Sequence, residues 1–309
     1  MDFPKIILID MNSFFASVEQ QANPFLRGKP VGVVASMHET SCLIATSKEA
    51  KKLGIKTGTL TYKAKKIYPK IILLKAEPEK YREINRRLVK IFRDYTDRVE
   101  VYSIDEAFLQ LNPNIEYLNP KQYQNPKHKI QNSFEHFNLE NSNLFSASDL
   151  GFRISQPLLV AVEIKRRIRE EVGEWLTCSV GIAANKFMAK LACDLQKPDG
   201  LSIVWRQNLP EIYKTKRLRD LWGISRGWEG RFLKLGIRSP LQLLGYPEQN
   251  LISLFGKPGY YLWERVNGLE KDNIKPSVYP PSLSPSATSP PQAGENQSEE
   301  TQIKSFGHT

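Results

Sequence analysis

Cysteine is scarce in this sequence, with three residues in 309 and none of them in a C-x-x-C spacing. An odd number without paired spacing does not favour a disulfide framework or a zinc site. We therefore expect Cys42, Cys178 and Cys193 to be reduced, buried and structural. Long apolar runs are missing too, and the first residues lack the basic start and apolar stretch of a signal peptide. These absences predict a cytoplasmic protein without a membrane partner.

Acidic residues are fewer than basic ones, with 33 Asp and Glu against 44 Lys and Arg. The net charge is +11 for the whole chain and −2 after Lys275, which leaves +13 on residues 1–275. Such an excess indicates a polyanionic partner, and nucleic acid is a more common one than a membrane surface. A chain of 309 residues can form two or three domains.

The apolar pattern begins with a strand and a helix. Residues Lys5–Asp10 have the continuous apolar character of a buried strand and end in an acid. The helix expected over residues 14–21 has Asn12 or Ser13 as its cap. Residues 24–76 have the short strands and helices of a small α/β insertion.

After this insertion, apolar residues again recur with the spacing of a helix. Two other segments show no periodic pattern of apolar residues. Apolar residues recur at steps of three and four after Pro78 and again over residues 157–172, which predicts two amphipathic helices. Residues 112–154 are rich in Asn, Gln, Ser and Pro, and we interpret them as a loop insertion. Residues 276–303 contain six prolines, six serines and no Lys or Arg, which is typical of a linker.

Two adjacent acids, Asp105 and Glu106, interrupt an apolar, β-prone stretch. Acids are poor strand formers, and a buried pair repels and loses hydration unless a cation compensates it. Neighbouring strand side chains point to opposite faces, so both acids reach one site only if the backbone turns there. We therefore predict a hairpin with arms at Glu100–Tyr102 and Ala107–Leu111 and its tip at Ser103–Glu106. The alternative is a surface turn with two solvated acids.

A third acid, Asp10, lies where a predicted strand meets a helix start. Ligand sites are common at such places, although a plain turn or cap residue has the same pattern. With Asp105 and Glu106 it would complete three carboxylates on adjacent strands, a donor set that suits Mg²⁺. Two such ions about 4 Å apart support phosphoryl transfer. Lys186 opens the helix after Asn185, and its ammonium is expected to bind triphosphate oxygens at the positive helix end.

The segment Lys214–Arg238 is basic and contains two glycine turns, with eight Lys or Arg against two acids. Helices joined by such turns present backbone N–H groups to a phosphate backbone without reading bases. We therefore predict a helix-hairpin-helix unit whose DNA contacts are made by Gly223, Ile224 and Ser225, although Ser225 stands where a second glycine is usual. An ordinary small helical domain is the alternative.

The motifs together resemble the Y-family (UmuC/DinB-type) translesion DNA polymerases. Ile9–Glu19 is similar to the first family motif, Tyr102–Ala107 to its S-x-D-E-A motif, and Ser179–Ala192 to the third. Gln196–Gly200 follows at the expected place. Three ordered motifs are hard to obtain by chance, and the resemblance covers residues 5–275 apart from the polar loop.

The resemblance implies an α+β fold with a ferredoxin-like palm, small inserted α/β fingers and a helical helix-hairpin-helix thumb. It divides the chain into a palm (1–22 and 77–195, with the polar loop insertion 112–154), fingers (23–76), a thumb (196–275), a Pro/Ser-rich linker (276–303) and the start of a missing little finger domain (304–309).

The activity implied by the resemblance is that of an error-prone, DNA-directed DNA polymerase core for translesion synthesis in DNA repair and the SOS response. Its substrates would be dNTPs and primed template DNA, and its reaction nucleotidyl transfer to a primer 3′-OH. Asp10, Asp105 and Glu106 would be the catalytic residues and bind two Mg²⁺ ions, assisted by the Met11 carbonyl. Phe15 falls at the steric-gate position, where its ring would clash with a ribose 2′-OH.

Four further residues would contact the nucleotide. Phe14 would lie beside the sugar and phosphates, and Lys186 on the triphosphate. The family often has Tyr and Arg in the fingers helix, where this chain has Lys48 and Lys51. Lys51 keeps the charge but loses the planar fork, and Lys48 adds charge where a phenol hydrogen bond is usual. Members of the family vary here, so the departures do not indicate inactivation.

Residues 304–309 resemble only the first few residues of the little finger, which grips DNA in the major groove. We therefore expect a truncated or split polymerase with weak, salt-dependent DNA binding. A sliding clamp or an accessory subunit is a candidate partner through the missing C-terminal region. The alternatives are a damaged-DNA-binding accessory protein with weak or no catalysis, and a nucleotidyl cyclase, against which the basic segment 214–238 argues.

Overall fold

The computed structural model describes residues 4–112, 148–271 and 274–277, with side chains from residue 156 onward in the second range. The expectations for residues 113–147, for most of the linker and for residues 304–309 lie outside this part of the chain. Within it, no helix has both the length and the apolar character needed to cross a bilayer.

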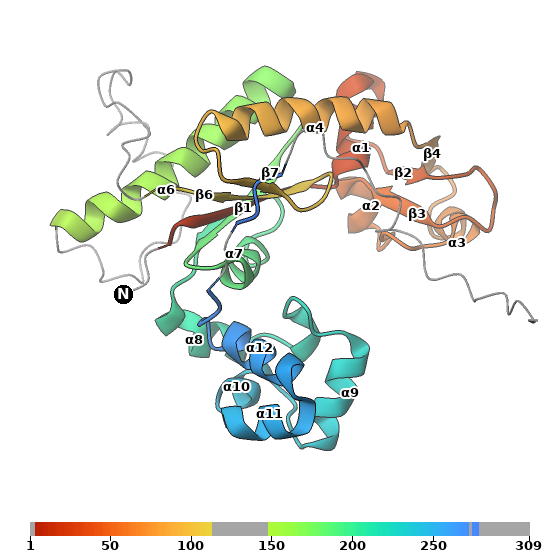
Figure 1. The fold of residues 1–309 in the computed structure, drawn as a ribbon. Coiled ribbons are helices and arrows are strands. Elements are labelled where there is room, and N and C mark those ends of the chain that lie inside the picture. Colours follow the sequence, from red (N-terminus) through yellow and green to blue (C-terminus); the bar gives the residue numbers. More distant parts are fainter. Residues whose placement is uncertain (1–3, 113–147, 272–273, 278–309) are drawn as a thin grey trace, which may run out of the picture.

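The central sheet has five strands in the order β5-β6-β1-β7-β8 (Figure 1). Its middle strand, β1 (Ile6–Met11), pairs antiparallel with β6 (Glu106–Gln110) and β7 (Cys178–Ala183). β5 (Val99–Val101) pairs antiparallel with β6, and β8 (Leu201–Ile203) pairs parallel with β7. Every residue of β1 is buried because both faces of the sheet are covered. Numbered 1 to 4 along the chain, the strands β1, β5, β6 and β7 of this sheet have the 4-1-3-2 order of a ferredoxin-like sheet. The predicted α+β class is confirmed.

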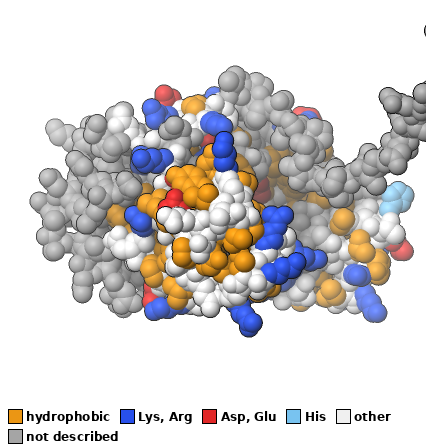
Figure 2. All heavy atoms as spheres, turned by 60° about the horizontal axis from the view of Figure 1, so that its bottom comes forward, with side chains coloured by type: hydrophobic (Ala, Val, Ile, Leu, Met, Phe, Trp, Pro, Cys, Tyr) orange, Lys and Arg blue, Asp and Glu red, His pale blue; other side chains and the backbone are white. Residues whose placement is uncertain are grey.

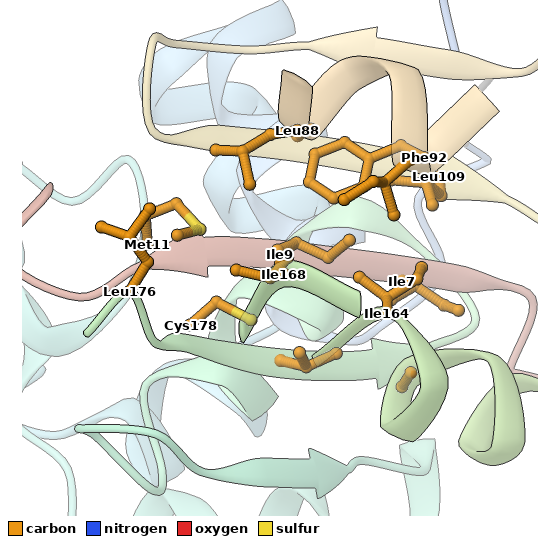
Figure 3. Close-up of a cluster of buried hydrophobic side chains, with 14 of the residues drawn as sticks. Ile7, Ile9, Met11, Leu88, Phe92, Leu109, Ile164, Ile168, Leu176 and Cys178 are labelled. Carbon is orange, nitrogen blue, oxygen red and sulfur yellow. The ribbon is translucent and has the colours of Figure 1, made fainter. Parts of the chain in front are cut away.

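Two long helices cover one face of the sheet (Figure 1). They are α4 (Pro78–Arg93) and α6 (Ser148–Arg167), which continues into a π-helical turn, η2 (Ile168–Val172). The odd-numbered residues of β1 face them, and Figure 3 shows Ile7 and Ile9 among Leu88, Phe92 and Ile164. The even-numbered residues therefore face the other side.

The helix α6 begins earlier than predicted. Residues 148–154 are helical rather than part of a loop, and Pro157 lies inside the helix. The expectation of an irregular segment through residue 154 is therefore wrong at its C-terminal end. Proline lacks an N–H group and is unfavourable in a helix interior, which is why the sequence pattern favoured a start at this residue.

The opposite face of the sheet is covered by α7 (Lys186–Cys193), which packs closely on β1 and β7. Asn185 caps this helix as predicted, because its side chain accepts the Met188 N–H at 2.9 Å. Gly181 permits the close approach: a Cβ atom there would lie 2.0 Å from the Ala189 carbonyl oxygen. The even-numbered residues of β1, including Asp10, thus face α7.

A small second unit is inserted between β1 and α4 and follows α1 (Phe14–Ala22) and η1 (Pro24–Leu26). Its sheet has the order β3-β2-β4, and its elements are β2 (Val31–Val34), β3 (Leu43–Thr46), α2 (Lys48–Lys52), α3 (Thr61–Ile67) and β4 (Ile72–Lys75). These strands and helices fall within residues 24–76, where the sequence predicted a small α/β insertion.

Two local expectations near this unit are wrong. Cys42 is exposed, because it precedes β3, whereas Cys178 and Cys193 are buried; all three are free thiols. Ser13 occupies the cap position of α1 in a left-handed conformation and makes no side-chain cap hydrogen bond. The hydroxyl of Ser17 donates to the Asn12 carbonyl at 2.7 Å instead, so a residue inside the helix satisfies this backbone group.

The C-terminal unit is helical and lies below the sheet in Figure 1. It comprises η3 (Arg206–Asn208), α8 (Leu209–Lys214), η4 (Leu218–Asp220), α9 (Arg226–Lys234), α10 (Pro240–Leu244), α11 (Glu248–Phe255) and α12 (Lys257–Val266). Figure 2 shows apolar side chains on its outer face with Lys and Arg around them. The first glycine turn follows a 3₁₀ turn, η4, rather than an α-helix, and Gly223 has φ +86°.

After α12 the chain returns to the free edge of the central sheet. The Ser277 N–H donates to the Val99 carbonyl, and the Val101 N–H donates to the Ser277 hydroxyl, both at 2.9 Å. The Lys275 N–H donates to a carboxylate oxygen of Glu100 at 2.8 Å. The helical unit is thus tied to the sheet at both of its ends.

Candidate active site

The three predicted carboxylates lie at one end of the central sheet. Asp10 is opposite Glu106 in the β1–β6 register, so their side chains are cross-strand neighbours on the α7 face. Asp105 lies in the β5–β6 turn; its carbonyl accepts the Met11 N–H at 2.9 Å, and its carboxylate accepts the Ser103 hydroxyl at 2.7 Å. The predicted hairpin is confirmed, but Glu106 is the first residue of β6 rather than part of the tip, and the turn brings only Asp105 toward Asp10.

Burial and mutual contact separate the pKa values of the carboxyl groups. Burial raises the pKa of Glu106 to about 7, and its hydrogen bond with Asp10 adds to the rise. Burial also works against ionised Asp10, but Lys190, the hydrogen bond with Glu106 and Lys197 together hold its pKa below the ordinary value. The pKa of Asp105 is raised by burial, although the Ser103 hydrogen bond opposes the rise. Such separation is common where carboxylates carry chemistry.

Two lysines that were not among the predicted site residues contact these acids. The Lys190 ammonium lies 2.8 Å from Asp10 Oδ2 and also bonds Glu106 Oε1. The Lys197 ammonium lies 2.6 Å from the same Asp10 oxygen and 2.8 Å from Asp194. The two ammonium groups thus supply positive charge where a metal ion would.

The sequence contains a pattern that could have pointed to each of these two lysines. Lys190 follows Lys186 by four residues, which places it one turn further along the same helix face. Lys197 belongs to the segment Gln196–Gly200 that resembles a family motif. Their direction toward Asp10 depends on the packing of α7 against β1, which no sequence period specifies.

The donor set fits Mg²⁺. Ligand atoms of Asp10, Asp194 and Cys193 lie within 4.8 Å of one another. Burial raises the pKa of the Cys193 thiol, which donates to the Ser179 carbonyl at 3.4 Å and stays protonated. The remaining donors are carboxylate oxygens, which hard divalent cations prefer, and the two ammonium groups show that this position favours positive charge.

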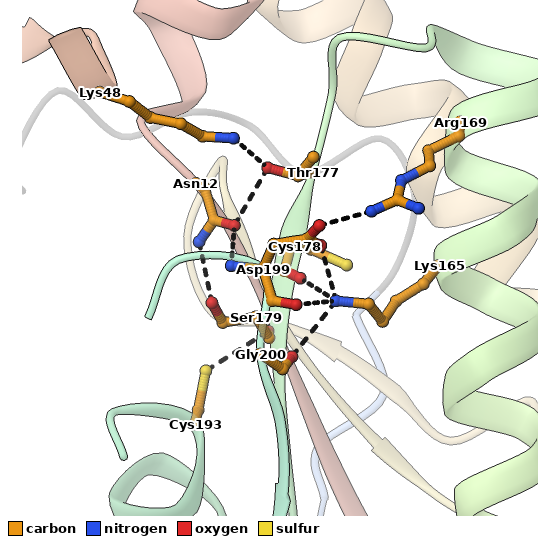
Figure 4. Close-up of polar contacts among 10 residues, drawn as sticks. All are labelled: Asn12, Lys48, Lys165, Arg169, Thr177, Cys178, Ser179, Cys193, Asp199 and Gly200. Carbon is orange, nitrogen blue, oxygen red and sulfur yellow. Dashed lines mark hydrogen bonds and ion pairs between the residues drawn. The ribbon is translucent and has the colours of Figure 1, made fainter. Parts of the chain in front are cut away.

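The predicted nucleotide-binding lysines lie in three different surroundings. Lys48 donates to the Thr177 hydroxyl at 2.9 Å (Figure 4). Lys51 is near the carboxylates: burial lowers its pKa and Lys197 adds to the lowering, while Asp10 and Asp105 oppose it. The ammonium of Lys186 lies 3.3 Å from a carboxylate oxygen of Glu100.

A polar network holds the backbone behind the site (Figure 4). The Asn12 side chain donates to the Ser179 hydroxyl at 2.9 Å, and its carbonyl oxygen accepts the Thr177 hydroxyl and the Asp199 N–H. Lys165 donates to Asp199 Oδ1 at 2.7 Å and to nearby carbonyl groups. These bonds connect the end of β1 to β7 and to the segment that carries Lys197.

The two aromatic residues of the first motif are at the start of α1. Phe14 is buried and Phe15 is partly buried. The ring of Phe15 stacks on Tyr81 of α4, with centroids 4.2 Å apart and planes at 19°. Tyr81 belongs to the apolar pattern after Pro78 that predicts an amphipathic helix, and this pattern does not distinguish it from a core residue.

In the predicted DNA-binding turn, the Ile224 side chain is buried and its N–H donates to the Leu221 carbonyl at 3.1 Å. Gly223 and Ser225 are exposed on either side. A phosphate contact would therefore fall on these two residues rather than on Ile224.

Comparisons with known proteins agree with this arrangement. The family model described as "impB/mucB/samB family" matches residues 9–194, which is more than half of the chain. The DNA polymerase IV of Moorella thermoacetica is 35% identical over 88% of this chain and 59% of its own length. The DNA polymerase IV of Clostridium perfringens (strain 13) is 31% identical over 88% of this chain and 65% of its own.

Solved structures show the same fold. A Y-family DNA polymerase chimera of Dbh and Dpo4 matches with a TM-score of 0.67 and 25% identity, covering 88% of this chain and 70% of its own. DinB from Sulfolobus solfataricus matches with a TM-score of 0.65, 26% identity, and coverage of 88% and 69%. The chain spans about 65% or less of the length of these curated polymerase IV relatives. With its carboxylate site and its sheet order, this chain belongs to the impB/mucB/samB family and is a Y-family homologue of DNA polymerase IV and DinB.

Proposed function

We propose that the protein is an error-prone, DNA-directed DNA polymerase that extends a primer past damaged template bases in DNA repair and the SOS response. The observation that carries the proposal is the meeting of Asp10 and Glu106 across β1 and β6, beside Asp105 and two lysines. Relatives named DNA polymerase IV support the same activity. DNA and dNTPs are the substrates, and the cytoplasm is the location.

Each structural unit has a part in this proposal. The central sheet with α4, α6 and α7 serves as the palm, the inserted α/β unit as the fingers, and the helical unit that begins after the motif Gln196–Gly200 as the thumb. Support comes from the position of the carboxylates, which are on the sheet face that also packs against the helical unit. A template-primer bound between the two would have its primer end at this face.

Asp10, Asp105 and Glu106 would hold two Mg²⁺ ions, with the Met11 carbonyl as a fourth ligand. Such ions would supply the charge that lowers the pKa of a primer 3′-OH and that neutralises the leaving pyrophosphate. To hold them, Glu106 would lose its proton, and Asp10 and Glu106 would release the Lys190 ammonium. The nucleotide is transferred when the 3′-OH attacks the α-phosphate.

Positive side chains near the acids bind the triphosphate. Lys197 and Lys51 are the best placed, because Lys197 contacts Asp10 directly and Lys51 is influenced by both Asp10 and Asp105. Phosphate oxygens offer Lys197 a charge-assisted hydrogen bond in place of the one to Asp10. Lys48 can reach the same phosphates by leaving Thr177, whereas Lys186 has Glu100 as its observed partner.

The thumb contributes DNA binding without sequence preference. The turn is exposed at Gly223 and Ser225, and the basic residues of α9 follow it along the chain. Contacts of this kind position the duplex and are screened by salt. A sliding clamp or accessory subunit would add affinity if it bound the protein on DNA.

Primer extension at low salt with Mg²⁺ tests the proposal. Asp105→Ala should abolish extension, because the site loses a metal ligand and the charge that it supplies. Asp97→Ala is the matched control, since Asp97 is exposed just before β5 on the same hairpin. Equal extension by wild type and Asp105→Ala would refute catalysis at this site. Tight DNA binding without any extension would instead support the non-catalytic accessory protein.

A further inference from the structure

The ring of Phe15 does not stand alone at the start of α1. One of its faces is stacked on Tyr81 of α4, with ring centroids 4.2 Å apart and planes inclined by only 19°. Phe14 is tilted against both rings at 5.7 Å and 6.5 Å. Tyr81 is 2% exposed, so the surface behind Phe15 is closed.

Tyr81 is held at its other end by a buried carboxylate. Its hydroxyl donates to Glu19 Oε1 at 2.8 Å, and Glu19 Oε2 accepts the Lys80 ammonium at 2.8 Å. The Glu19 side chain is only 7% exposed. Phe15 and Glu19 are four residues apart on α1, so one helix face holds both the ring and the hydroxyl of Tyr81.

Burying the charge of the Glu19 carboxylate is an expensive way to gain stability. Well-packed apolar residues of the same volume are often as stable or more stable, because two charges need not be removed from water. What the contacts with Glu19 provide is a fixed orientation for the Tyr81 ring, since a tyrosine held at both its hydroxyl and its face cannot tilt. Burial and the Glu19 hydrogen bond raise the pKa of Tyr81, so its hydroxyl remains a donor.

We propose that Tyr81, held by Glu19 and Lys80, is a positioning residue that keeps the Phe15 ring from yielding to a ribose 2′-OH. A steric barrier excludes the larger sugar only if it does not move, because a ring that shifts relieves the clash. The Tyr81 ring covers one face of the Phe15 ring, so Phe15 cannot shift toward α4. This inference rests on the proposed function, since it concerns how that polymerase selects deoxynucleotides.

The size of the effect follows from the kind of contact that is lost. Aromatic pairs contribute roughly 0.5–1.5 kcal/mol beyond their buried area, which corresponds to about a 2- to 10-fold change in a rate ratio. Tyr81→Leu removes the flat surface and should lower the preference for dATP over ATP by about 10-fold. Tyr81→Phe keeps the ring but loses the bond to Glu19, so its effect should be about 2- to 4-fold.

The test measures kcat/KM for dATP and for ATP opposite a template thymine, using the full chain and primed DNA. Phe15→Ala should remove most of the preference. If Tyr81 acts through Phe15, adding Tyr81→Leu to Phe15→Ala changes nothing further, because the supported ring is already absent. Tyr95→Phe is the matched control: Tyr95 is buried just after α4 and contacts Arg167, and its variant should keep the wild-type ratio.

Each outcome decides something different. Active Tyr81→Leu and Tyr81→Phe with the wild-type dATP/ATP ratio overturn the inference and leave the proposed polymerase intact. An additional loss of selectivity in the double variant also overturns it, because Tyr81 would then act independently of Phe15. If the wild type extends no primer, the proposed function fails, and calorimetric affinities for dATP and ATP with Mg²⁺ replace the kinetic ratio. Equal affinity of the wild type for both nucleotides, or binding of neither, then overturns the inference as well.

Discussion

At the scale of single residues, the free-energy cost of forming the site falls on the buried carboxyl group of Glu106. The folded protein keeps a proton on this carboxyl up to about pH 7, because burial and Asp10 disfavour the charged form. The ionised form of Glu106, which a bound cation would stabilise, therefore destabilises the fold of the metal-free protein. Active sites commonly exchange stability for function in this way.

The pH dependence of stability follows directly. The folded-state pKa of Glu106 is about 7 against an ordinary 4.5, so the folded state holds a proton that the unfolded chain has lost in this window. Stability therefore falls as pH rises from 4.5 to 7, by up to about 3 kcal/mol at 1.36 kcal/mol per pKa unit. In metal-free protein, Glu106→Gln should raise the free energy of unfolding at pH 8 by about 1–3 kcal/mol and change it little at pH 5. Urea unfolding at both pH values measures this, and an equal effect at both would contradict it.

The lysines differ in their expected contribution to nucleotide binding. Lys197→Ala should raise the KM for dNTP by roughly 10- to 100-fold, the value of a charge-assisted hydrogen bond of about 1.5–3 kcal/mol. Lys186→Ala is the comparison, because its observed partner is Glu100, and its effect should be several-fold smaller. Steady-state kinetics with both variants decides which lysine meets the triphosphate. A larger effect for Lys186 would support the triphosphate contact predicted from its position at the helix start.

At the scale of elements, glycines show where backbone geometry rather than packing is decisive. Gly223 has φ +86° in the turn before α9, a conformation that side chains with a Cβ rarely adopt. Gly230 lies inside α9, and a Cβ added there meets nothing within 4 Å. The same substitution therefore has opposite consequences seven residues apart.

We expect Gly223→Ala to lower the free energy of unfolding by about 1 kcal/mol, the cost of a left-handed conformation. Gly230→Ala should raise it by about 0.5–1 kcal/mol, because alanine is the better helix former. Thermal unfolding of both variants gives the signs. Two changes of the same sign would show that the turn and the helix are not as described.

At the scale of the whole molecule, net charge governs the DNA binding that we propose for this protein. The excess of +13 on residues 1–275 includes the basic segment that contains α9, while the carboxylates form a local acidic centre on the sheet. Diffuse positive charge binds phosphates through counterion release. The binding constant should therefore fall steeply with salt.

Substitutions can show that the surface around α9 contributes to the salt dependence of DNA binding. Replacing Arg226, exposed at the start of α9, with alanine should reduce the slope of log K against log[salt] by about 0.9, the value for one phosphate contact. Arg82→Ala on α4 is the control, because Arg82 pairs with Glu79 on the opposite face of the sheet and should leave the slope unchanged. Fluorescence anisotropy from about 50 to about 300 mM salt, a range over which the Debye length falls more than twofold, measures both slopes.

The sequence alone determined the α+β class, the inserted unit and the three carboxylates, because each depends on local periodicity or on a contiguous motif. Because side chains alternate along a strand, Asp10 had to lie on the face of β1 opposite to Ile7 and Ile9. Tertiary structure decided the rest: that Lys190 and Lys197 contact Asp10, that Lys186 contacts Glu100, and that the Tyr81 ring stacks on Phe15. These contacts join residues 66 to 187 positions apart, and they arise from how α4 and α7 pack on the sheet, which a sequence period does not encode.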